Sequence, residues 1–338
     1  MNKHSQISLE PIQDLLRHYQ LRLGGVRNPH LLCVNSGFCA PSTHNLQRLV
    51  TILNRFLFLF AFLLPLLLTS NSWANKLPEQ LAVPGGIIKI AVADINEAKP
   101  KVFFYNKRVL LTSNDTHWLA LVGIPLSAKA GEHKITIKSG KQSHQQLFTI
   151  TDKAYPAQHI TIKKKRMVSG FTKEDLKKIN ADKVAMAKAK ATWTEQLVDT
   201  DFMAPVDGRL SSLFGLKRFF NDIPKRPHNG LDIAAATGTP ILAPAVARVI
   251  DTGNYYFNGN TVFLDHGQGL LSAYLHMNEI KVQPGQIVKQ GDVLGTVGET
   301  GRVTGPHLHW IVYLNKVPVD PALFISKDMA RLDARNKK

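Results

Sequence analysis

The stretch Gly305-Pro306-His307-Leu308-His309-Trp310-Ile311-Val312-Tyr313 decides how the second half of the chain folds. Apolar, β-branched and aromatic residues dominate it, which is typical of a β-strand. Successive residues of a strand point to opposite faces, so His307 and His309 share one face. The stretch therefore predicts two imidazoles side by side on a sheet.

A second stretch, Pro227-His228-Asn229-Gly230-Leu231-Asp232, places an imidazole and a carboxylate four residues apart. Its Asn-Gly pair favours a turn that leads into a strand at residues 231–233, which argues against the helical H-E-x-x-H zinc signature. Nitrogen and oxygen donors from few protein ligands suit a catalytic zinc ion, which keeps one coordination position open. We therefore expect any metal to lie on a sheet.

The chain begins with a segment that we expect to lie outside the fold. Residues 56–68 form an apolar run that follows two arginines and precedes Ser72-Trp73-Ala74. This run is short for a membrane span and suits the apolar core of a signal peptide that is cleaved after Ala74. Residues 1–74 are thus predicted to be a leader, and the long part before the apolar run indicates a start site assigned too far upstream. An uncleaved anchor in the inner membrane is the alternative.

Composition limits the partners of the remaining chain. Residues 1–74 carry six of the 42 basic and two of the 25 acidic side chains, which leaves a net charge of +13. They also hold both cysteines, Cys33 and Cys39, so a mature chain would have no disulfide and no cysteine for a lipid anchor. A basic exported protein favours polyanions of the cell wall over nucleic acid, for which we find no motif.

Residues 75–163 are predicted to form a small all-β domain. Short strand patterns at residues 87–92, 101–105, 117–122, 133–137 and 145–150 are mostly separated by glycine and asparagine turn signals. Regular short strands of this kind suggest a β-sandwich. The four histidines of this region have no metal-ligand spacing, and we expect them to be solvated: His117, His133, His144 and His159.

Residues 164–200 are predicted to be a helical linker. Thr172 and Asp175 resemble a capping box, and the stretch from there to about Val198 is rich in Ala, Lys and Glu. We expect its lysines to be solvated, with docking to an acidic polymer as the alternative. Residues 201–325 turn β-rich and glycine-rich again, with strand patterns that include 241–250, 260–265 and 271–276. Residues 326–338 are predicted to be a basic tail.

At this point the chain resembles a known family, the LytM/lysostaphin-type zinc metallopeptidases (M23). The order, spacing and glycine setting of five segments within residues 203–325 carry this resemblance: residues 214–218, 228–232, 266–269, 274–276 and 301–309. The preceding β domain is similar to the one found in some Gram-negative members. The resemblance implies a mainly β protein with a β-sandwich-like domain, a helical linker and a β-rich LytM-type peptidase domain.

Carried over to this chain, the resemblance implies that His228, Asp232 and His309 bind Zn²⁺, with water as the fourth ligand. It also implies that His276 and His307 lie beside the metal as catalytic residues without binding it. From spacing alone, His307 could replace His309 as the ligand, because both lie on one face. His266 is expected to be a turn residue.

The family implies a periplasmic endopeptidase that cuts peptidoglycan stem-peptide cross-links, with D-alanyl-diaminopimelate bonds expected from the Gram-negative type of upstream domain. Arg218 is expected either to bind a substrate carboxylate or to form an ion pair. Restraint by a regulatory protein, by the upstream domain or by residues 199–227 fits this architecture, and membrane contact is expected only through an uncleaved leader. A non-catalytic activator of wall amidases is the alternative, although a candidate stands at every ligand and catalytic position. A third possibility is a wall-binding module based on the β domain.

Overall fold

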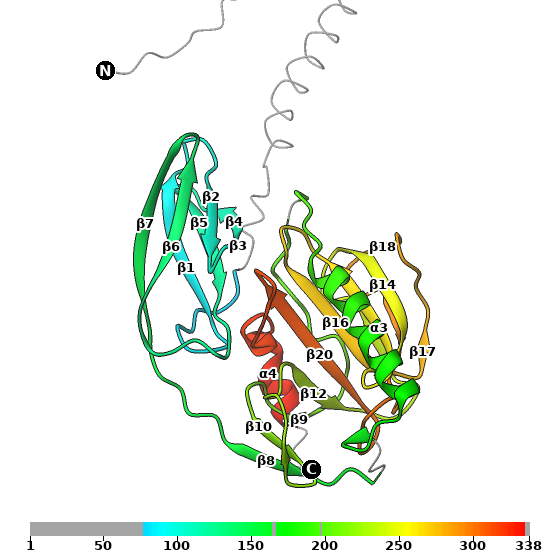
Figure 1. Cartoon of the computed structure of the whole chain (residues 1–338). Helices are drawn as coiled ribbons and strands as arrows, with labels where there is room; N and C mark the ends of the chain where they lie inside the picture. Colours follow the sequence, from blue (N-terminus) through cyan, green and yellow to red (C-terminus); the bar gives the residue numbers. More distant parts are fainter. Residues whose placement is uncertain (1–76, 164–166, 197, 335–338) are drawn as a thin grey trace, which may run out of the picture. The chain divides into compact units, whose positions relative to one another are not determined.

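The computed structural model describes residues 77–163, 167–196 and 198–334, and these residues form a mainly β protein (Figure 1). The predicted leader, residues 1–74, lies outside the described residues. Within the described ranges, no helix has the length and apolar character needed to cross a membrane.

The first domain is a sandwich of two antiparallel sheets, as the strand spacing predicted. One sheet has the order β1 (Ile87–Asp94), β5 (His117–Gly123), β4 (Leu110–Ser113). The other has the order β3 (Lys107–Arg108), β2 (Lys101–Phe104), β6 (Gly131–Ser139), β7 (Gln142–Ile150). Their apolar faces form one core, in which Ile135 and Ile137 of β6 are fully buried while Lys134 before them and Lys138 after them are exposed. This alternation is what a half-buried strand requires.

The connection to the second domain contains a strand and a helix. Strand β8 (Ala157–Ile160) pairs in parallel with β10 (Lys217–Phe220), which also pairs with β11 (Ile223–Pro224). The sequence had placed residues 157–160 in the first domain, yet their strand partner lies in the second. Alternating apolar patterns identify a strand but not the strand beside which it lies.

Helix α3 (Lys173–Lys190) begins at the predicted capping box. The side-chain oxygen of Thr172 accepts from Asp175 N at 3.1 Å, and the Asp175 carboxylate accepts from Thr172 N at 3.1 Å. The helix ends earlier than the sequence indicated, and Thr194 after it forms hydrogen bonds with residues 265 and 268 of the second domain. Its hydroxyl donates to the Asp265 carboxylate at 2.7 Å, and its carbonyl accepts from Gln268 N at 2.8 Å.

The second domain is organised around an eight-stranded antiparallel sheet. Its order is β18 (Ile287–Val288), β14 (Ala247–Tyr255), β15 (Gly259–Asp265), β16 (Leu271–Met277), β20 (His307–Leu314), β12 (Leu231–Ala234), β9 (Arg209–Ser212), with β21 (Val317–Val319) also paired to β20. A smaller sheet has the order β13 (Pro240–Leu242), β19 (Val293–Thr296), β17 (Glu279–Ile280).

The two faces of β20 pack into different cores, as its alternation predicted. Leu308, Trp310 and Val312 enter the main core of the domain. Ile311 and Tyr313 face the other way, into a cluster that includes Ala185, Met186 and Ala189 of α3. Helix α3 thus covers this face of the sheet (Figure 1). Because both faces are covered, β20 is rigid enough to carry a site at one end.

Two local predictions were wrong. Residues 241–250 form β13 and β14 instead of one strand, since Pro244 between them has no amide hydrogen for a ladder. The segment expected to be a basic tail contains helix α4 (Ser326–Ala334), which follows the 3₁₀ turn η3 (Pro321–Leu323). Leu332 of α4 is fully buried, and the Asp328 carboxylate accepts from Ala204 N at 2.8 Å.

His266 is a structural residue of the loop between β15 and β16. It is buried, its Nδ1 donates to the Val246 carbonyl at 3.2 Å, and its Nε2 accepts from the Ser272 hydroxyl at 2.8 Å. Burial lowers the pKa of His266 from 6.5 to about 4, against the opposing effect of the Val246 hydrogen bond. This imidazole is therefore neutral at neutral pH, and protonating it would cost folding free energy.

The pKa of His266 predicts acid destabilisation. As pH falls from 6.5 to 4, His266 takes up a proton in the unfolded chain but remains neutral in the folded chain. The free energy of unfolding that is present above pH 6.5 therefore decreases between pH 6.5 and pH 4. The shift corresponds to about 3 kcal/mol at 1.36 kcal/mol per pKa unit. Urea unfolding with chelator present should therefore show a smaller loss of stability between pH 7.5 and pH 4.5 for His266→Gln than for the wild type. Equal pH dependence in both proteins would contradict this role.

Candidate metal centre

Three side chains that are distant in sequence converge in the second domain. His228, Asp232 and His309 are buried, and one possible ligand atom from each lies within 4.8 Å of the others. Asp232 Oδ1 is 2.6 Å from His309 Nδ1 and 3.0 Å from His228 Nε2, and these two nitrogens are 3.0 Å apart. This is the only such cluster among the residues that the structure describes.

Strand pairing places two of these groups together. Asp232 of β12 is the direct partner of His309 of β20 in the antiparallel ladder. His228 reaches the same point from the turn before β12. Gly230 allows the close approach, because a Cβ there would lie 2.3 Å from the Trp310 carbonyl oxygen and 3.1 Å from His309 Cε1. The glycine of the predicted turn is thus required by the packing of the site.

A backbone hydrogen bond fixes the orientation of His228. Its Nδ1 donates to the Leu213 carbonyl at 2.6 Å, which leaves the Nε2 lone pair directed at Asp232 and His309. Such an outer hydrogen bond selects the tautomer and aims the nitrogen of a metal-binding histidine. Two nitrogen donors and one carboxylate, with no cysteine, are the donor set of a catalytic zinc site with an open position.

His276 and His307 lie beside the cluster. Their ring centroids are 5.0 Å apart, and the His276 ring is 6.0 Å from that of His309. The Nδ1 of His276 donates to the Thr300 carbonyl and that of His307 to the Gly305 carbonyl, each at 2.8 Å. In the neutral rings the lone pair is therefore on Nε2, and His307 Nε2 lies 3.9 Å from Asp232 Oδ1.

The backbone at His276 is unusual. This residue follows Leu275 near the end of β16 with a φ of 65°, the left-handed region that non-glycine residues rarely adopt. Its amide donates to the Asn258 carbonyl at 2.9 Å, which helps to hold this conformation. Strained backbone is frequent at functional sites, where the surrounding structure supports it.

Burial and charge set the protonation of the cluster. Burial of Asp232 favours its neutral form, but the adjacent His309 and His228 outweigh this effect and hold the pKa of the carboxyl well below its usual range. Burial lowers the pKa of His309 to about 4, although Asp232 opposes the shift. Burial also lowers the pKa of His276 strongly, assisted by His307 and His309. At neutral pH the site thus offers a carboxylate and neutral imidazoles at these positions.

Arg218 forms an ion pair within the site. Its Nη2 lies 2.5 Å from Asp232 Oδ2, and both side chains are largely buried. Of the two expectations for this residue, the structure shows the ion pair. Sequence reasoning missed Ser212 and Gln158, which bond to Arg218 from other strands, because no local pattern identifies such contacts.

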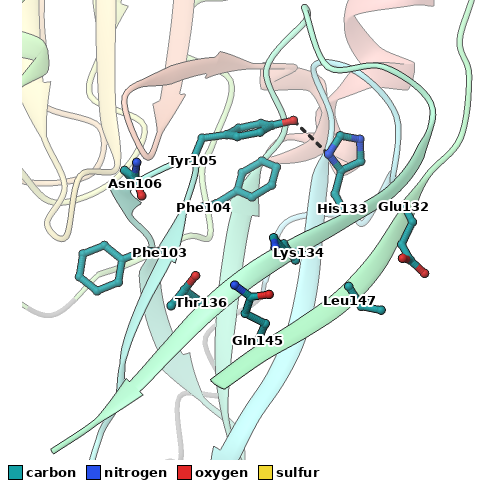
Figure 2. Close-up of a pocket in the computed structure, with 10 residues that line it drawn as sticks. All are labelled: Phe103, Phe104, Tyr105, Asn106, Glu132, His133, Lys134, Thr136, Gln145 and Leu147. Atoms are coloured by element: carbon teal, nitrogen blue, oxygen red, sulfur yellow. Dashed lines mark hydrogen bonds between the residues drawn. The ribbon is translucent and has the colours of Figure 1, made fainter. Parts of the chain in front are cut away.

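The first domain has a separate shallow hollow of about 500 Å³ (Figure 2). Phe103, Thr136, Gln145 and Leu147 line it on strands β2, β6 and β7. At its edge, Tyr105 Oη lies 3.0 Å from His133 Nδ1. His133 is partly exposed on β6 and forms a hydrogen bond, and none of these residues belongs to the His/Asp cluster.

Comparisons with known proteins identify the family of this chain. Residues 226–321 match the family described as "Peptidase family M23", and residues 80–153 match "Peptidase family M23 N-terminal domain". The peptidoglycan DD-endopeptidase ShyA of Vibrio cholerae serotype O1 is 38% identical over 146 residues, which are 40% of this chain and 34% of ShyA. The cell division protein DipM of Caulobacter vibrioides is 36% identical over 154 residues, 44% of this chain and 23% of DipM. The chain thus spans only about a third or less of these relatives.

A solved structure matches over a greater length. The crystal structure of a peptidase M23 from Pseudomonas aeruginosa is 40% identical, with a TM-score of 0.61. The alignment covers 73% of this chain and 96% of that chain. Since nearly all of that structure is matched at this identity, the chain belongs to the M23 family of peptidases.

Proposed function

We propose that this protein is a zinc-dependent endopeptidase that hydrolyses peptide cross-links of peptidoglycan. The observation that supports this proposal most directly is the buried cluster of His228, Asp232 and His309 with His276 and His307 beside it. The cluster has a catalytic donor set, and the two further imidazoles carry lone pairs on Nε2 in their neutral form.

In this proposal His228 Nε2, Asp232 Oδ1 and His309 Nδ1 would hold the zinc ion. Bound zinc supplies Lewis acidity and lowers the pKa of a bound water to about 7. His276 and His307 would then share the proton transfers. One imidazole accepts the proton of the attacking water as the C–O bond forms, the peptide C–N bond breaks, and the proton passes to the leaving amine. The other imidazole, when it carries a proton on Nε2, would donate a hydrogen bond to the negative charge that develops on the carbonyl oxygen.

The substrate assignment is supported by the similarity to ShyA, a peptidoglycan DD-endopeptidase, and by charge. After removal of residues 1–74 the chain has a net charge of +13, which favours the free carboxylates of stem peptides. We propose the D-alanyl-diaminopimelate bond as the cross-link that is cut. Export by the predicted signal peptide would place the enzyme in the periplasm, where this bond is accessible.

The alternative of a non-catalytic amidase activator would need no metal cluster. The five candidate residues at the ligand and catalytic positions are all present, and they converge in the structure. The enzyme is therefore the function that the site supports best.

The first expected result concerns the metal. The wild-type protein from Asn75 onward should bind one zinc ion per chain, and His309→Ala should lower the affinity by more than about 100-fold, since the loss of a ligand exceeds the effect of outer partners. His144→Ala, on the exposed face of β7, is the matched control and should bind zinc as the wild type does. Competition with a chromogenic chelator measures this affinity. Normal zinc binding by His309→Ala would remove this residue from the ligand set.

The second expected result separates catalysis from metal binding. His276→Gln should retain zinc but release monomers from purified diaminopimelate-type sacculi about 10²- to 10⁴-fold more slowly, the usual contribution of proton transfer. The muropeptides are resolved by mass, with a chelator-treated sample as the blank. Full hydrolysis by a zinc-loaded His276→Gln protein would exclude His276 from the chemistry.

A further inference from the structure

The two oxygens of Asp232 have different partners. Oδ1 points to the nitrogens of His228 and His309, where a metal would bind. Oδ2 accepts a hydrogen bond from Arg218 Nη2 at 2.5 Å. A carboxylate can rotate about its Cβ–Cγ bond, so a charged donor on one oxygen fixes the direction of the other. Arg218 thus determines where Asp232 Oδ1 lies.

Arg218 is in turn held by two neutral acceptors, and one of them also holds the other. Its Nε donates to Gln158 Oε1 at 3.2 Å, and its Nη2 donates to Ser212 Oγ at 3.2 Å. Ser212 also donates to the same Gln158 Oε1, at 3.3 Å. Arg218 Nη2 therefore donates to both Asp232 and Ser212, while Gln158 accepts from Nε and so fixes that edge of the guanidinium. Gln158 Oε1 thus accepts hydrogen bonds from both Arg218 and Ser212.

Gln158 comes from the segment that joins the two domains. It is the direct ladder partner of Arg218 in the parallel pairing of β8 with β10, so the two side chains lie on one face of that sheet. The pairing is anchored at both ends, by Lys217 N to the Pro156 carbonyl at 2.9 Å and by Asn221 N to the Ile160 carbonyl at 3.0 Å. Gln158 lies outside both stretches that match the family, residues 80–153 and 226–321.

We propose that Gln158 is a positioning residue for the metal site. It orients Arg218, which orients Asp232, so strand β8 completes a site whose ligands all lie in the second domain. The inference rests on the proposed zinc site but concerns residues to which the proposed function assigns no role. A peptidase domain without β8 would accordingly have the three ligands but a less ordered carboxylate.

Gln158→Leu tests the relay because it removes the acceptor at similar volume and without a change of charge. Zinc affinity, measured by chelator competition, should fall about tenfold, the lower limit for outer partners of metal ligands. Gln158→Glu restores an acceptor for Arg218 and should recover most of the affinity. His159→Ala is the matched control, since His159 lies next in β8 but is exposed and stacks on Phe219 at 4.7 Å. It should bind zinc as the wild type does.

A double-mutant cycle identifies the route. In an Arg218→Met background, Gln158→Leu should have no further effect on zinc affinity, because the residue through which it acts is gone. Equal losses in both backgrounds would overturn the relay, and so would equal effects of Gln158→Leu and His159→Ala, which would mark a general loss of β8 packing. If the wild type binds zinc and Gln158→Leu binds it equally well, the relay is wrong while the proposed function stands. A wild type that takes up no zinc would overturn both.

Discussion

The antiparallel register of β12 and β20 is the constraint on which the site depends. It makes Asp232 and His309 direct partners, and Gly230 allows the two backbones to approach closely enough for His228 to join them. A slip of one residue would turn one of these side chains to the opposite face of the sheet. The register is secured by the burial of β20 on both faces, so the packing of the whole second domain contributes to the geometry of three side chains.

Burial has opposing effects on the groups of this site. It favours neutral His309 and His276, which suits a ligand and a proton acceptor, but it disfavours the carboxylate of Asp232. The neighbouring histidines lower the pKa of that carboxyl, and Arg218 forms an ion pair with it. A buried site with one fixed anion is a suitable environment for a cation and for transition-state charge, since electrostatic interactions are stronger away from bulk water.

Local patterns in the sequence predicted much of this arrangement. Alternation placed His307 and His309 on one face, and the Asn-Gly turn before Leu231 led correctly to a strand. The division of roles among the histidines came from family resemblance, because spacing alone does not distinguish His307 from His309. The contacts of Gln158 with Ser212 and Arg218 had no sequence signal, since these residues lie 54 and 60 positions away from Gln158 along the chain. The fold of residues 326–334 was missed because their short apolar pattern is stabilised by contacts with distant residues, such as that of Asp328 with Ala204.

The most direct test of the account is hydrolysis of one purified cross-linked muropeptide dimer in water enriched in ¹⁸O, followed by mass spectrometry. A zinc-dependent endopeptidase should yield two monomers, with one ¹⁸O atom in the new carboxylate of the donor D-alanine and none in the released amine. This result would identify the bond that is cut and show that the new carboxylate takes its oxygen from water. A folded, zinc-loaded protein that leaves the dimer intact, or that cuts the bond between sugar and peptide, would contradict the central claim.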